Sequence, residues 1–546
     1  MNSAWSSPSA HSGMTIGDQL ARHARSVPDA VALRMDGVDR TYRELDARVD
    51  RLANALRTRG VDQGDRVVVM TFNGLEMVEA FFACARLGAI CVPINFRLHA
   101  DEVAYQLSDS GAVLAVVEAG LAGTFARAWK DVPTVRHCLV VGDEPVADME
   151  RYEDALRDAP ESGPGVAVDL HAPAFIMYTS GTTGRPKGAV LTHYNLVIQT
   201  MSRFAHIGVP ADCRVWLIST PLFHIGGLAA LLSSVLVGAR AVIARSGRFD
   251  PVETVDLFER ERIAYCFLVP AQWQAVCDVP GIADRDLSAL RIISWGAAPA
   301  TKALLRRMIE TFPAAKLLSV FGQTESSAVS TVLLGEDALR KIGSVGTPLV
   351  NVEVRIVDER MNDVPRGEIG EIVYRGPSIM AGYWNKPAET AQAFAGGWFH
   401  SGDLVRQDED GYIYVVDRLK DMIISGGENI YSAEVEEAIA AHPKVAEVAV
   451  VGVPDERWGE TPLAVVVPAG APDPPTAEEI AQWCRSRLAA YKVPRRVAVV
   501  AELPRNASGK VRKHELRQAY GPAPARASST NARPAGDSAA ESYTSP

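Results

Sequence analysis

The sequence predicts an α/β protein with a large N-terminal domain of sheets rich in parallel strands, a small β subdomain and a smaller α+β C-terminal domain. Apolar runs of strand length alternate with segments of helical periodicity, as in 66–72 (RVVVMTF), 75–88 (LEMVEAFFACARLG) and 90–94 (ICVPI). Such alternation, with strands apolar throughout, is typical of parallel sheets covered by helices. At 546 residues, the chain also exceeds the size of a single core, so at least two domains are expected.

The predicted elements follow this order along the chain. The strand pattern continues through AVLAVVE, RVWLIST, ARAVIA, AYCFLV, RIIS and KLLSV, with amphipathic segments between them. From 351 to 416 the helical patterns stop, and short strands separated by turns predict the β subdomain. A change of composition at 417–421 (DRLKD) then precedes a compact unit. Its expected elements are a helix (434–441), strands (445–453 and 462–468), a helix (477–490) and a strand (496–501).

These boundaries divide the chain into four parts. We expect a disordered lead-in at 1–13, the N-terminal domain at 14–417, the C-terminal domain at 418–520 and a disordered tail at 521–546. The tail is rich in Pro, Ala and Ser, a composition that cannot build an apolar core.

Composition narrows the class of protein. A net charge of −10 without a basic block argues against a nucleic-acid partner. No apolar run reaches the ~18 residues of a membrane helix, and the N-terminal segment lacks the features of a secretory signal. The seven cysteines are scattered, without a C-x-x-C pair, which favours reduced thiols and a cytoplasmic location.

The most informative segment is 175–193 (FIMYTSGTTGRPKGAVLTH), where an apolar strand ends in small hydroxyl and glycine residues. Backbone N–H groups and hydroxyls in such a loop can surround an anion, and Lys187 adds charge, so a polyphosphate is the expected ligand. Lysine is scarce, 11 residues against 45 arginines, which argues against a generic surface role. The spacing differs from a Walker A loop, because Gly184 lies three residues before Lys187 and Gly188 replaces the Ser or Thr. A flexible glycine-serine turn is the alternative.

Three further motifs are weaker when taken alone. In 317–328 (LLSVFGQTESSA) a hydroxyl beside a carboxylate suits a phosphate oxygen and Mg²⁺, although a capped helix start looks similar. Asp403, after Ser-Gly, suits a ribose, and Lys510 follows Ser-Gly in 503–513 (LPRNASGKVRK). Solvated loops are the alternative for the last two.

Together, the order and detail of these motifs resemble the adenylate-forming superfamily, which comprises acyl-CoA synthetases, adenylation domains of peptide synthetases and luciferases. The resemblance covers about residues 14–518 and is greatest to the fatty acyl-CoA and aryl-CoA ligases. It implies an ATP-dependent, AMP-forming acyl-CoA synthetase with a mobile C-terminal domain. Such an enzyme joins a carboxylic acid to AMP with release of pyrophosphate, and then transfers the acyl group to CoA. ATP, Mg²⁺ and CoA are the implied cofactors and co-substrates.

The resemblance implies nucleotide-binding roles for matched residues. The β- and γ-phosphates of ATP would be held by Lys187 and the loop Thr179, Ser180, Gly181, Thr182, Thr183 and Gly184. The adenine would lie against Gly296, Ala297 and Ala298 of SWGAAP, with Phe321 stacked on it and Gly322 in the same motif. Thr324 would contact the α-phosphate, Glu325 would bind Mg²⁺, and Asp403 and Arg418 would hold the ribose.

The remaining matched residues concern the acid, CoA and domain movement. His224 of PLFHIGG would lie beside the acyl carboxylate, and Lys510 would complete the adenylation site. Lys420 falls at the hinge position, and Gly426 and Gly427 would line the pantetheine channel. The sequence departs from the family pattern mildly, with Asn506 where Thr is common and Phe321 where Tyr is common.

The segments expected around the acid are 223–232, 294–298 and 321–328. Apart from His224 they contain no charged side chain before Glu325, and their glycines at 226, 227 and 322 leave room for a long or flat group. A fatty or aromatic acid is therefore expected, because an α-amine or a second carboxylate would be buried without a partner. Trp295 either borders this pocket or points into the core.

Other readings of the chain remain open. An adenylating ligase could pass the activated group to a carrier protein, an amine or another small nucleophile instead of CoA. Against this, no Asp stands after Phe223 to bind an amino group, no carrier site follows, and no insertion is visible near the hinge. A nucleotide-binding regulator without turnover predicts damaged motifs, whereas all four are intact. A homodimer is one of the oligomeric states that the sequence leaves open.

Overall fold

The structure is a computed structural model that describes residues 13–179, 185–247, 249–425, 428–455, 458–470, 474–505 and 509–521. Its internal contacts divide the chain into two compact units, 1–420 and 421–546. The predicted lead-in and tail lie outside the described residues, apart from Gly13 and Gly521.

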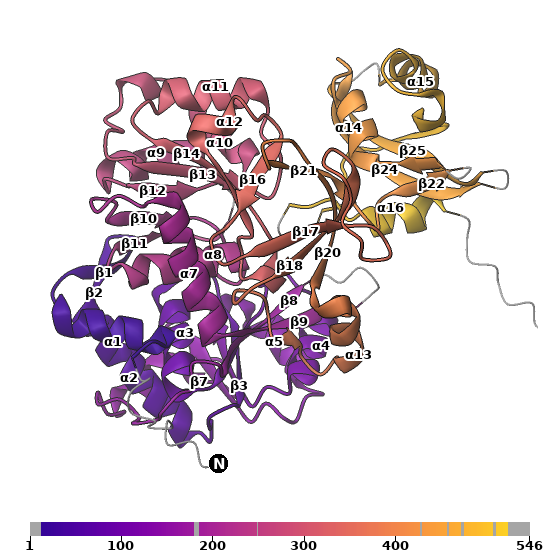
Figure 1. Ribbon diagram of the computed structural model, residues 1–546. Helices are drawn as coiled ribbons and strands as arrows, with labels where there is room; N and C mark the ends of the chain where they lie inside the picture. The colour runs from indigo at the N-terminus through magenta and orange to yellow at the C-terminus, as the bar shows by residue number, and fades with distance from the viewer. Residues whose placement is uncertain are drawn as a thin grey trace, which may run out of the picture. The chain divides into compact units, whose positions relative to one another are not determined.

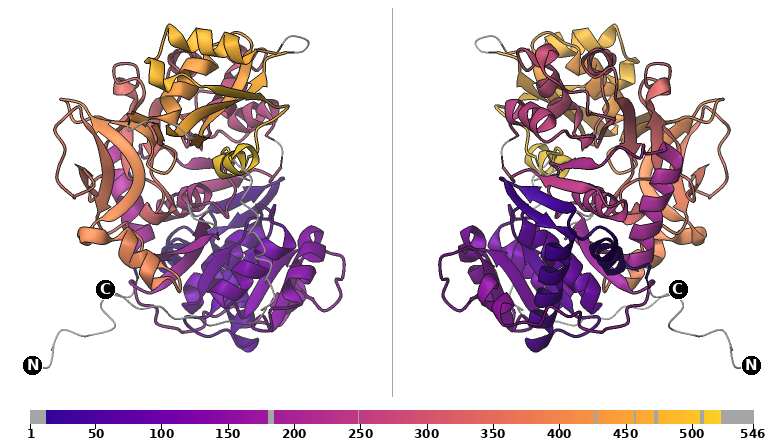
Figure 2. Two further views of the ribbon diagram at one scale, coloured as in Figure 1. Left: turned by 90° about the vertical axis from the view of Figure 1, so that its right-hand side faces the viewer. Right: turned by 90° about the vertical axis from the view of Figure 1, so that its left-hand side faces the viewer.

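The first unit contains an eight-stranded sheet with the order β19-β9-β8-β4-β3-β5-β6-β7. Its strands β3, β7, β8 and β9 are labelled in Figure 1, and Figure 2 gives two further views of the same unit. Six of its strands run parallel: β3 (Arg66–Met70), β4 (Ile90–Pro93), β5 (Leu114–Glu118), β6 (His137–Val141), β7 (Glu150–Arg151) and β8 (Pro173–Thr179). Strands β9 (Lys187–Thr192) and β19 (Gly382–Tyr383) complete the sheet in antiparallel pairing.

Helices cover both faces of this sheet, which explains why its strands are apolar throughout. Along β3, Val67 and Val69 pack in the core that holds α2 (Tyr42–Thr58) and α3 (Leu75–Leu87). The alternate residues Val68 and Met70 pack against α4 (Ala100–Ser110) and α5 (Ala122–Trp129).

The second sheet of this unit has thirteen strands and combines the predicted parallel region with the β subdomain. Its parallel part consists of β1 (Val31–Met35), β11 (Arg240–Ile243), β10 (Val215–Ile218), β12 (Tyr265–Phe267), β13 (Ile292–Gly296) and β14 (Lys316–Phe321). Its antiparallel part consists of β2 (Val38–Thr41) at one edge and, beyond β14, β15 (Thr331–Leu334), β16 (Ser344–Pro348), β21 (Ile413–Arg418), β20 (Phe399–Gln407), β18 (Ile369–Arg375) and β17 (Glu353–Val357).

Helices also cover this sheet on two sides. The core containing α7 (His193–Ile207) and α8 (Ile225–Leu236) lies on one side, and that of α9 (Pro251–Arg260), α10 (Pro270–Cys277) and α11 (Lys302–Thr311) lies on the other. Trp295 on β13 is 3% exposed and belongs to the second of these cores. The structure therefore favours the core position for the Trp295 indole.

One expectation for the β subdomain is wrong: helical structure does not stop between 351 and 416. A short helix, α13 (Pro387–Ala393), lies within this range. Pro387 occupies its first turn, where a missing N–H costs nothing, and the Ala, Glu and Gln residues that follow are good helix formers.

The second unit has a five-stranded sheet with helices packed on it. The strands are β22 (Ile423–Ser425), β23 (Glu428–Ile430), β24 (Val445–Asp455), β25 (Gly459–Pro468) and β26 (Arg496–Val499), and the helices are α14 (Ser432–Ala440), α15 (Ala477–Arg485) and α16 (Lys513–Tyr520). The order of helices and strands follows the sequence prediction, with the short β22–β23 hairpin and α16 in addition. The predicted α/β fold class, with its separate C-terminal domain, is confirmed.

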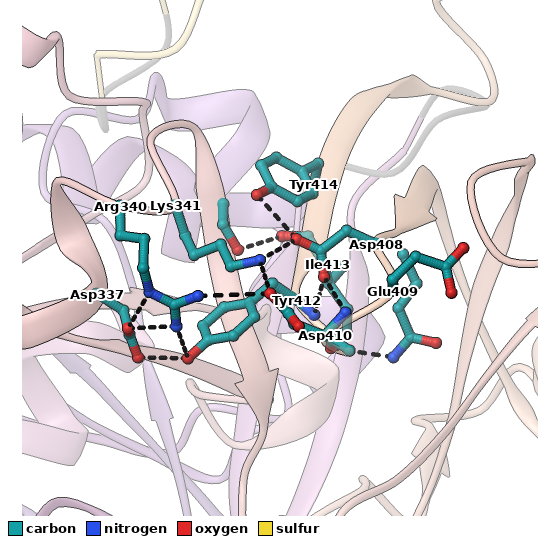
Figure 3. Close-up of polar contacts among 12 residues, drawn as sticks. Asp337, Arg340, Lys341, Asp408, Glu409, Asp410, Tyr412, Ile413 and Tyr414 are labelled. Carbon is teal, nitrogen blue, oxygen red and sulfur yellow. Dashed lines mark hydrogen bonds and ion pairs between the residues drawn. The ribbon is translucent and has the colours of Figure 1, made fainter.

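A cluster of charged and aromatic side chains fixes the turn between β20 and β21 (Figure 3). Lys341 Nζ lies 2.7 Å from an Asp408 oxygen and 2.5 Å from an Asp410 oxygen. The Tyr412 hydroxyl donates to Asp337, and the Tyr412 ring lies 4.8 Å from Lys341 Nζ. These contacts anchor the hairpin formed by β20 and β21 at its turn, and the same hairpin carries two of the predicted ribose residues, Asp403 on β20 and Arg418 at the end of β21.

All seven cysteines are buried, and none forms a disulfide. Burial raises the pKa of the Cys138 and Cys213 thiols to about 12 and that of Cys277 to about 11. None of the helices in the described ranges combines the length and hydropathy needed to cross a membrane.

Candidate active site

The predicted phosphate loop connects two paired strands. β8 ends at Thr179, β9 begins at Lys187, and these two residues lie opposite each other in the antiparallel pair. The Thr179 hydroxyl donates to the Lys187 carbonyl oxygen at 3.4 Å. Ser180, Gly181, Thr182, Thr183 and Gly184 lie outside the described residues. The hairpin geometry thus places Thr179 and Lys187 side by side at the two ends of the loop.

The predicted metal ligand Glu325 lies close to this hairpin. Its side chain is buried, and its Oε1 lies 3.4 Å from the Thr179 hydroxyl and 3.0 Å from the Tyr383 hydroxyl, both of which can donate to it. Its carbonyl oxygen accepts from the Met380 N–H at 2.8 Å. Two motifs far apart in the sequence, 175–193 and 317–328, are therefore joined through one carboxylate.

Sequence reasoning missed Tyr383, which contacts both motifs. Its hydroxyl bonds to Glu325, and its ring lies 5.1 Å from Lys187 Nζ, within the range of a cation–π contact. Burial, with the nearby Glu325, raises the pKa of Tyr383 far above its usual value, so the hydroxyl remains a donor at neutral pH. The pairing of β19 with β9 places this tyrosine, and the sequence pattern gave no signal of that pairing.

The residues around Glu325 suit Mg²⁺. The Thr179 and Tyr383 hydroxyls both lie on Oε1, which, among the residues that the structure describes, leaves Oε2 for a cation. In the described part of the chain, no three His, Cys, Asp or Glu side chains gather into a metal-binding group. This arrangement fits an ion that proteins usually hold through one or two carboxylates together with substrate phosphates and water.

The loops that follow β13 and β14 lie next to each other and are tightly packed. Gly296 pairs with Val320, and a Cβ on Gly296 would lie 2.5 Å from the Val320 oxygen. A Cβ on Gly322 would lie 2.4 Å from the Ala328 oxygen. Likewise, a Cβ on Gly227 would lie 2.4 Å from the Pro221 oxygen. The expectation that Gly227 and Gly322 leave room for the acid is therefore wrong, because the space beside each is filled by backbone.

The same two loops contain strained backbone. Ala297 has a φ of 66°, and Ser327 and Ala328 have φ values of 56° and 96°. Non-glycine residues rarely adopt these angles, and such strain is concentrated at functional sites. Among the other predicted nucleotide residues, Ala298 is exposed, whereas Phe321 and Thr324 are half-buried, at the end of β14 and the start of a 3₁₀ turn.

The two predicted ribose residues lie together. Asp403 on β20 and Arg418 on β21 are partners across the antiparallel pair, with 2.5 Å between Asp403 Oδ1 and Arg418 Nε. The Asp403 side chain is 3% exposed, and the Asp403 N–H donates to the Ser401 hydroxyl at 3.0 Å. A buried carboxylate paired with a half-exposed guanidinium keeps a fixed direction, which suits a residue that accepts hydrogen bonds from a ligand.

His224 caps the N-terminus of α8. Its Nδ1 accepts from the Gly226 N–H at 3.3 Å, so in the neutral ring Nε2 carries the proton. The preceding turn is held by Asn73, which the sequence did not single out: its side chain accepts from the Leu222 N–H at 2.8 Å and donates to the Thr220 carbonyl oxygen at 3.3 Å. Asn73 therefore fixes the segment that leads to His224.

Three phenylalanines form an aromatic cluster beside His224. The Phe72 and Phe96 ring centroids are 5.0 Å apart and those of Phe96 and Phe223 are 5.5 Å apart, both in edge-to-face geometry. Phe72 is 36% exposed and the other two are half-buried, so this aromatic cluster is not closed inside the core. Phe223 directly precedes His224, so the cluster adjoins the predicted acid-binding position.

The remaining predicted residues fall at the end of the first unit or in the second. Lys420 is exposed and is the last residue of the first unit. Before it, the Leu419 N–H donates to the Gly402 carbonyl oxygen at 2.9 Å, and after it, Asp421 pairs with Arg517 at 2.6 Å. Lys510 is exposed and follows Gly509, whose φ is 81°. Gly426 and Gly427 lie outside the described residues.

Family models match both units. The AMP-binding enzyme model matches residues 20–384, and the AMP-binding enzyme C-terminal domain model matches residues 434–510. The chain belongs to the AMP-binding enzyme family. The predicted resemblance to adenylate-forming enzymes is thereby confirmed.

Curated relatives extend over nearly the whole chain. A feruloyl-CoA synthase of Amycolatopsis sp is 42% identical, with 93% of this chain and 99% of the relative covered. An indoleacetate–CoA ligase of Aromatoleum aromaticum and a long-chain-fatty-acid–CoA ligase of Mycobacterium tuberculosis are each 39% identical, with 92% and 98% covered. This family member is therefore an AMP-forming acyl-CoA synthetase, as the motifs predict.

Solved structures agree with this class. An o-succinylbenzoate CoA synthetase of Bacillus subtilis in complex with its acyl-adenylate intermediate has a TM-score of 0.81 and 32% identity, covering 91% of this chain and 97% of its own. The same synthetase in complex with ATP and a magnesium ion has a TM-score of 0.80 and covers 91% and 98%. ATP, Mg²⁺ and CoA, the predicted cofactors and co-substrates, are those of this enzyme class.

Proposed function

We propose that this enzyme activates an aromatic carboxylic acid, of the aryl or arylpropenoic type, and transfers it to CoA. The observation that carries the proposal is the partly exposed aromatic cluster of Phe72, Phe96 and Phe223 beside His224. Edge-to-face contacts between rings are favourable beyond their buried area, by about 0.5–1.5 kcal/mol per pair, so such a cluster favours a flat aromatic group. Two of the three relatives named above, the feruloyl-CoA synthase and the indoleacetate–CoA ligase, are named for aromatic acids.

The first half-reaction requires two anions to meet. A carboxylate oxygen attacks the α-phosphorus of ATP, and the bond to the β-phosphate oxygen breaks. In our proposal Lys187 neutralises the departing phosphates, Thr324 contacts the α-phosphate, and Lys510 bridges the carboxylate and the α-phosphate. When bound at Glu325, Mg²⁺ supplies further neutralisation of phosphate charge. Catalysis thus consists of positioning and charge neutralisation, with no protein nucleophile.

The other site residues bind and orient the reactants. The Asp403–Arg418 pair would hold the ribose, and Phe321 and Gly296–Ala298 would border the adenine. His224, with its proton on Nε2, would donate a hydrogen bond to the acid's carboxylate. These roles follow from the family motifs and are compatible with the placement of the side chains.

The second half-reaction is attack of the CoA thiol on the adenylate. Lys510 must leave the site first, so we propose that the residues after Lys420, which form the second unit, rotate about Lys420. Support comes from the contacts on either side of it, since Leu419 is bonded within the first unit and Asp421 within the second. The glycines at 426 and 427 would then line the thiol channel.

A panel of acids tests the proposed substrate. AMP release should be measured with ferulate, cinnamate, benzoate, indoleacetate, decanoate, acetate and phenylalanine, each with and without CoA. We expect the highest kcat/KM with one of the four aromatic acids and at least tenfold less with acetate or the amino acid. The highest kcat/KM with decanoate would point to a fatty acid instead, and the highest with acetate or phenylalanine would overturn the hydrophobic-acid proposal.

The acceptor, the location and the oligomeric state need separate measurements. Steady adenylate turnover without CoA, accelerated by an amine or a carrier protein, would indicate the alternative acceptor. We further propose a cytoplasmic location, supported by the seven free cysteines, and cell fractionation tests it. We also propose a homodimer, for which light scattering of the purified protein gives the mass directly.

A further inference from the structure

A cavity of about 450 Å³ lies beside the phosphate-loop hairpin. It is lined by Tyr105, Ser108 and Asp109 of α4, Arg185 and Lys187 next to and on β9, and Lys386 and Glu389 at the start of α13. Figure 1 shows α4, α13 and β9 in the same part of the first unit. Of these residues, only Lys187 belongs to a role implied by the sequence motifs.

The charge of Asp109 is already matched within the protein. Lys386 Nζ lies 2.6 Å from Asp109 Oδ1, and the Tyr178 hydroxyl donates to Asp109 Oδ2 at 2.8 Å. The Asp109 side chain is 9% exposed. This partly buried pair contributes no net charge to the cavity.

Two other cations that line the cavity, Arg185 and Lys187, have no such ion pair among the described residues. Across the ranges that the structure describes, neither Arg185 nor Lys187 has a carboxylate oxygen within ion-pair distance. Glu389 is the remaining carboxylate of the lining, so the cavity carries a net charge of +1. Arg185 and Lys187 line the same cavity, and an anionic ligand bound there would be attracted by both cations.

The position of Arg185 is supported by Tyr105. The Arg185 guanidinium carbon lies 5.1 Å from the centroid of the Tyr105 ring, and the Tyr105 hydroxyl donates to the Pro186 carbonyl oxygen at 3.0 Å. Pro186, between the two cations, fixes its own φ. Arg185 is thus held on the cavity wall by α4, and Lys187 lies on the Tyr383 ring at 5.1 Å.

We propose that this cavity receives pyrophosphate as it leaves the phosphate loop, with Arg185 as a second cation beside Lys187. The proposal rests on the adenylation reaction described above. In that step the α-phosphorus gains a bond to the acid's oxygen and loses its bond to the bridging oxygen, whose electron pair leaves with pyrophosphate. Nothing is oxidised or reduced, and the product carries three to four negative charges that two adjacent cations can share.

Binding of magnesium pyrophosphate to the whole protein, measured by calorimetry without acid or CoA, tests the proposal. Arg185→Gln removes one cation, and we expect its Kd for pyrophosphate to rise about tenfold, equivalent to ~1.4 kcal/mol. Glu389→Gln removes the opposing charge, so its Kd should fall two- to fivefold. Arg306→Gln, which removes an exposed arginine of α11 that does not line the cavity, is the matched control and should leave the Kd unchanged.

A second arm distinguishes free pyrophosphate from the same group within ATP. The Kd of magnesium ATP should change less than twofold in Arg185→Gln, because the cavity serves the product. Equal weakening of ATP and pyrophosphate, an unchanged pyrophosphate Kd in Arg185→Gln, or shifts of the same sign in Arg185→Gln and Glu389→Gln would each overturn the proposal. Because the binding measurement needs no acid, its result can be interpreted even if the proposed aromatic substrate is wrong.

Discussion

The hydrogen bond from Tyr383 to Glu325 gives the sharpest test of the site. Tyr383→Phe removes one hydroxyl, 3.0 Å from Glu325 Oε1, and keeps the ring that lies 5.1 Å from Lys187 Nζ. The Thr179 hydroxyl, 3.4 Å from the same oxygen, is a weak contact, and the Lys187 carbonyl oxygen at 3.4 Å competes for its single proton. Glu325 would therefore lose the main contact that orients its carboxylate.

The magnitude follows from the type of bond. A hydrogen bond to a charged group contributes about 1.5–3 kcal/mol, which corresponds to roughly 10- to 150-fold in an equilibrium or rate constant. Because the lost contact orients the predicted Mg²⁺ ligand, we expect the Mg²⁺ concentration for half-maximal adenylation to rise within that range. Much of the rate should return at saturating Mg²⁺.

The assay is ATP–pyrophosphate exchange with the best acid, titrated with Mg²⁺. Tyr152→Phe is the matched control, since the Tyr152 hydroxyl donates to Glu79 at 2.7 Å in a fully buried pair that contains none of the predicted site residues. It should lower stability without moving the Mg²⁺ midpoint. A Tyr383→Phe enzyme with a reduced rate and an unchanged Mg²⁺ midpoint would refute the reasoning.

Four further predictions concern single residues. Lys510→Ala should abolish adenylate formation and leave thioester formation from supplied acyl-AMP largely intact, which separate half-reaction assays measure. Lys420→Pro should impair thioester formation more than adenylation, because proline fixes φ near −65° and removes torsional freedom from the hinge. Trp295→Ala should lower the free energy of unfolding by about 3–5 kcal/mol and leave acid preference unchanged, since the indole lies in the core. Burial lowers the pKa of His193 from 6.5 to about 4, so the unfolded chain takes up a proton at a higher pH than the folded protein. Stability should therefore fall as the pH is lowered from about 6.5 to 4, by up to ~3 kcal/mol for this group, and His193→Gln should reduce that fall in denaturant unfolding.

Each of these predictions has an opposing outcome. Equal loss of both half-reactions in Lys510→Ala would contradict its role in adenylation alone, and a proportional loss in Lys420→Pro would remove the hinge assignment. Wider tolerance of chain length in Trp295→Ala would place the indole on the acid pocket. An unchanged pH dependence in His193→Gln would mean that other groups cause the acid instability.

Local patterns along the chain predicted much of the fold and part of the site. The apolar run 66–72 and the helical segment 75–88 are recognisable because burial on two faces and amphipathic periodicity leave direct traces in the sequence. The sequence carries no comparable sign that the parallel strands and the strands of the β subdomain join into one thirteen-stranded sheet, because strand pairing depends on residues far apart in the chain. The helix at 387–393 was missed because it is short and lies among turn residues.

In the candidate site, too, the sequence predicted the residues that belong to motifs and missed those that matter only through contacts in the folded chain. Motifs with glycines and charged residues marked Lys187, Glu325 and Asp403, and the structure brings the first two together through Thr179 and Tyr383. Tyr383 and Asn73 carry no motif, since each matters only through a contact made by the folded chain. The glycines at 227 and 322 were interpreted as space for a ligand, whereas their neighbours are carbonyl oxygens of the chain itself.

The burial of all seven cysteines has a chemical consequence for an enzyme that uses a free thiol. CoA must bring its sulfur to the adenylate, and a reactive protein thiolate could take the acyl group in its place, with AMP leaving. Such an attack requires an accessible thiolate, and Cys138, Cys213 and Cys277, whose pKa burial raises to about 12, 12 and 11, supply almost none at neutral pH. Because all seven cysteines are buried, they do not compete with the CoA thiol for the acyl-adenylate.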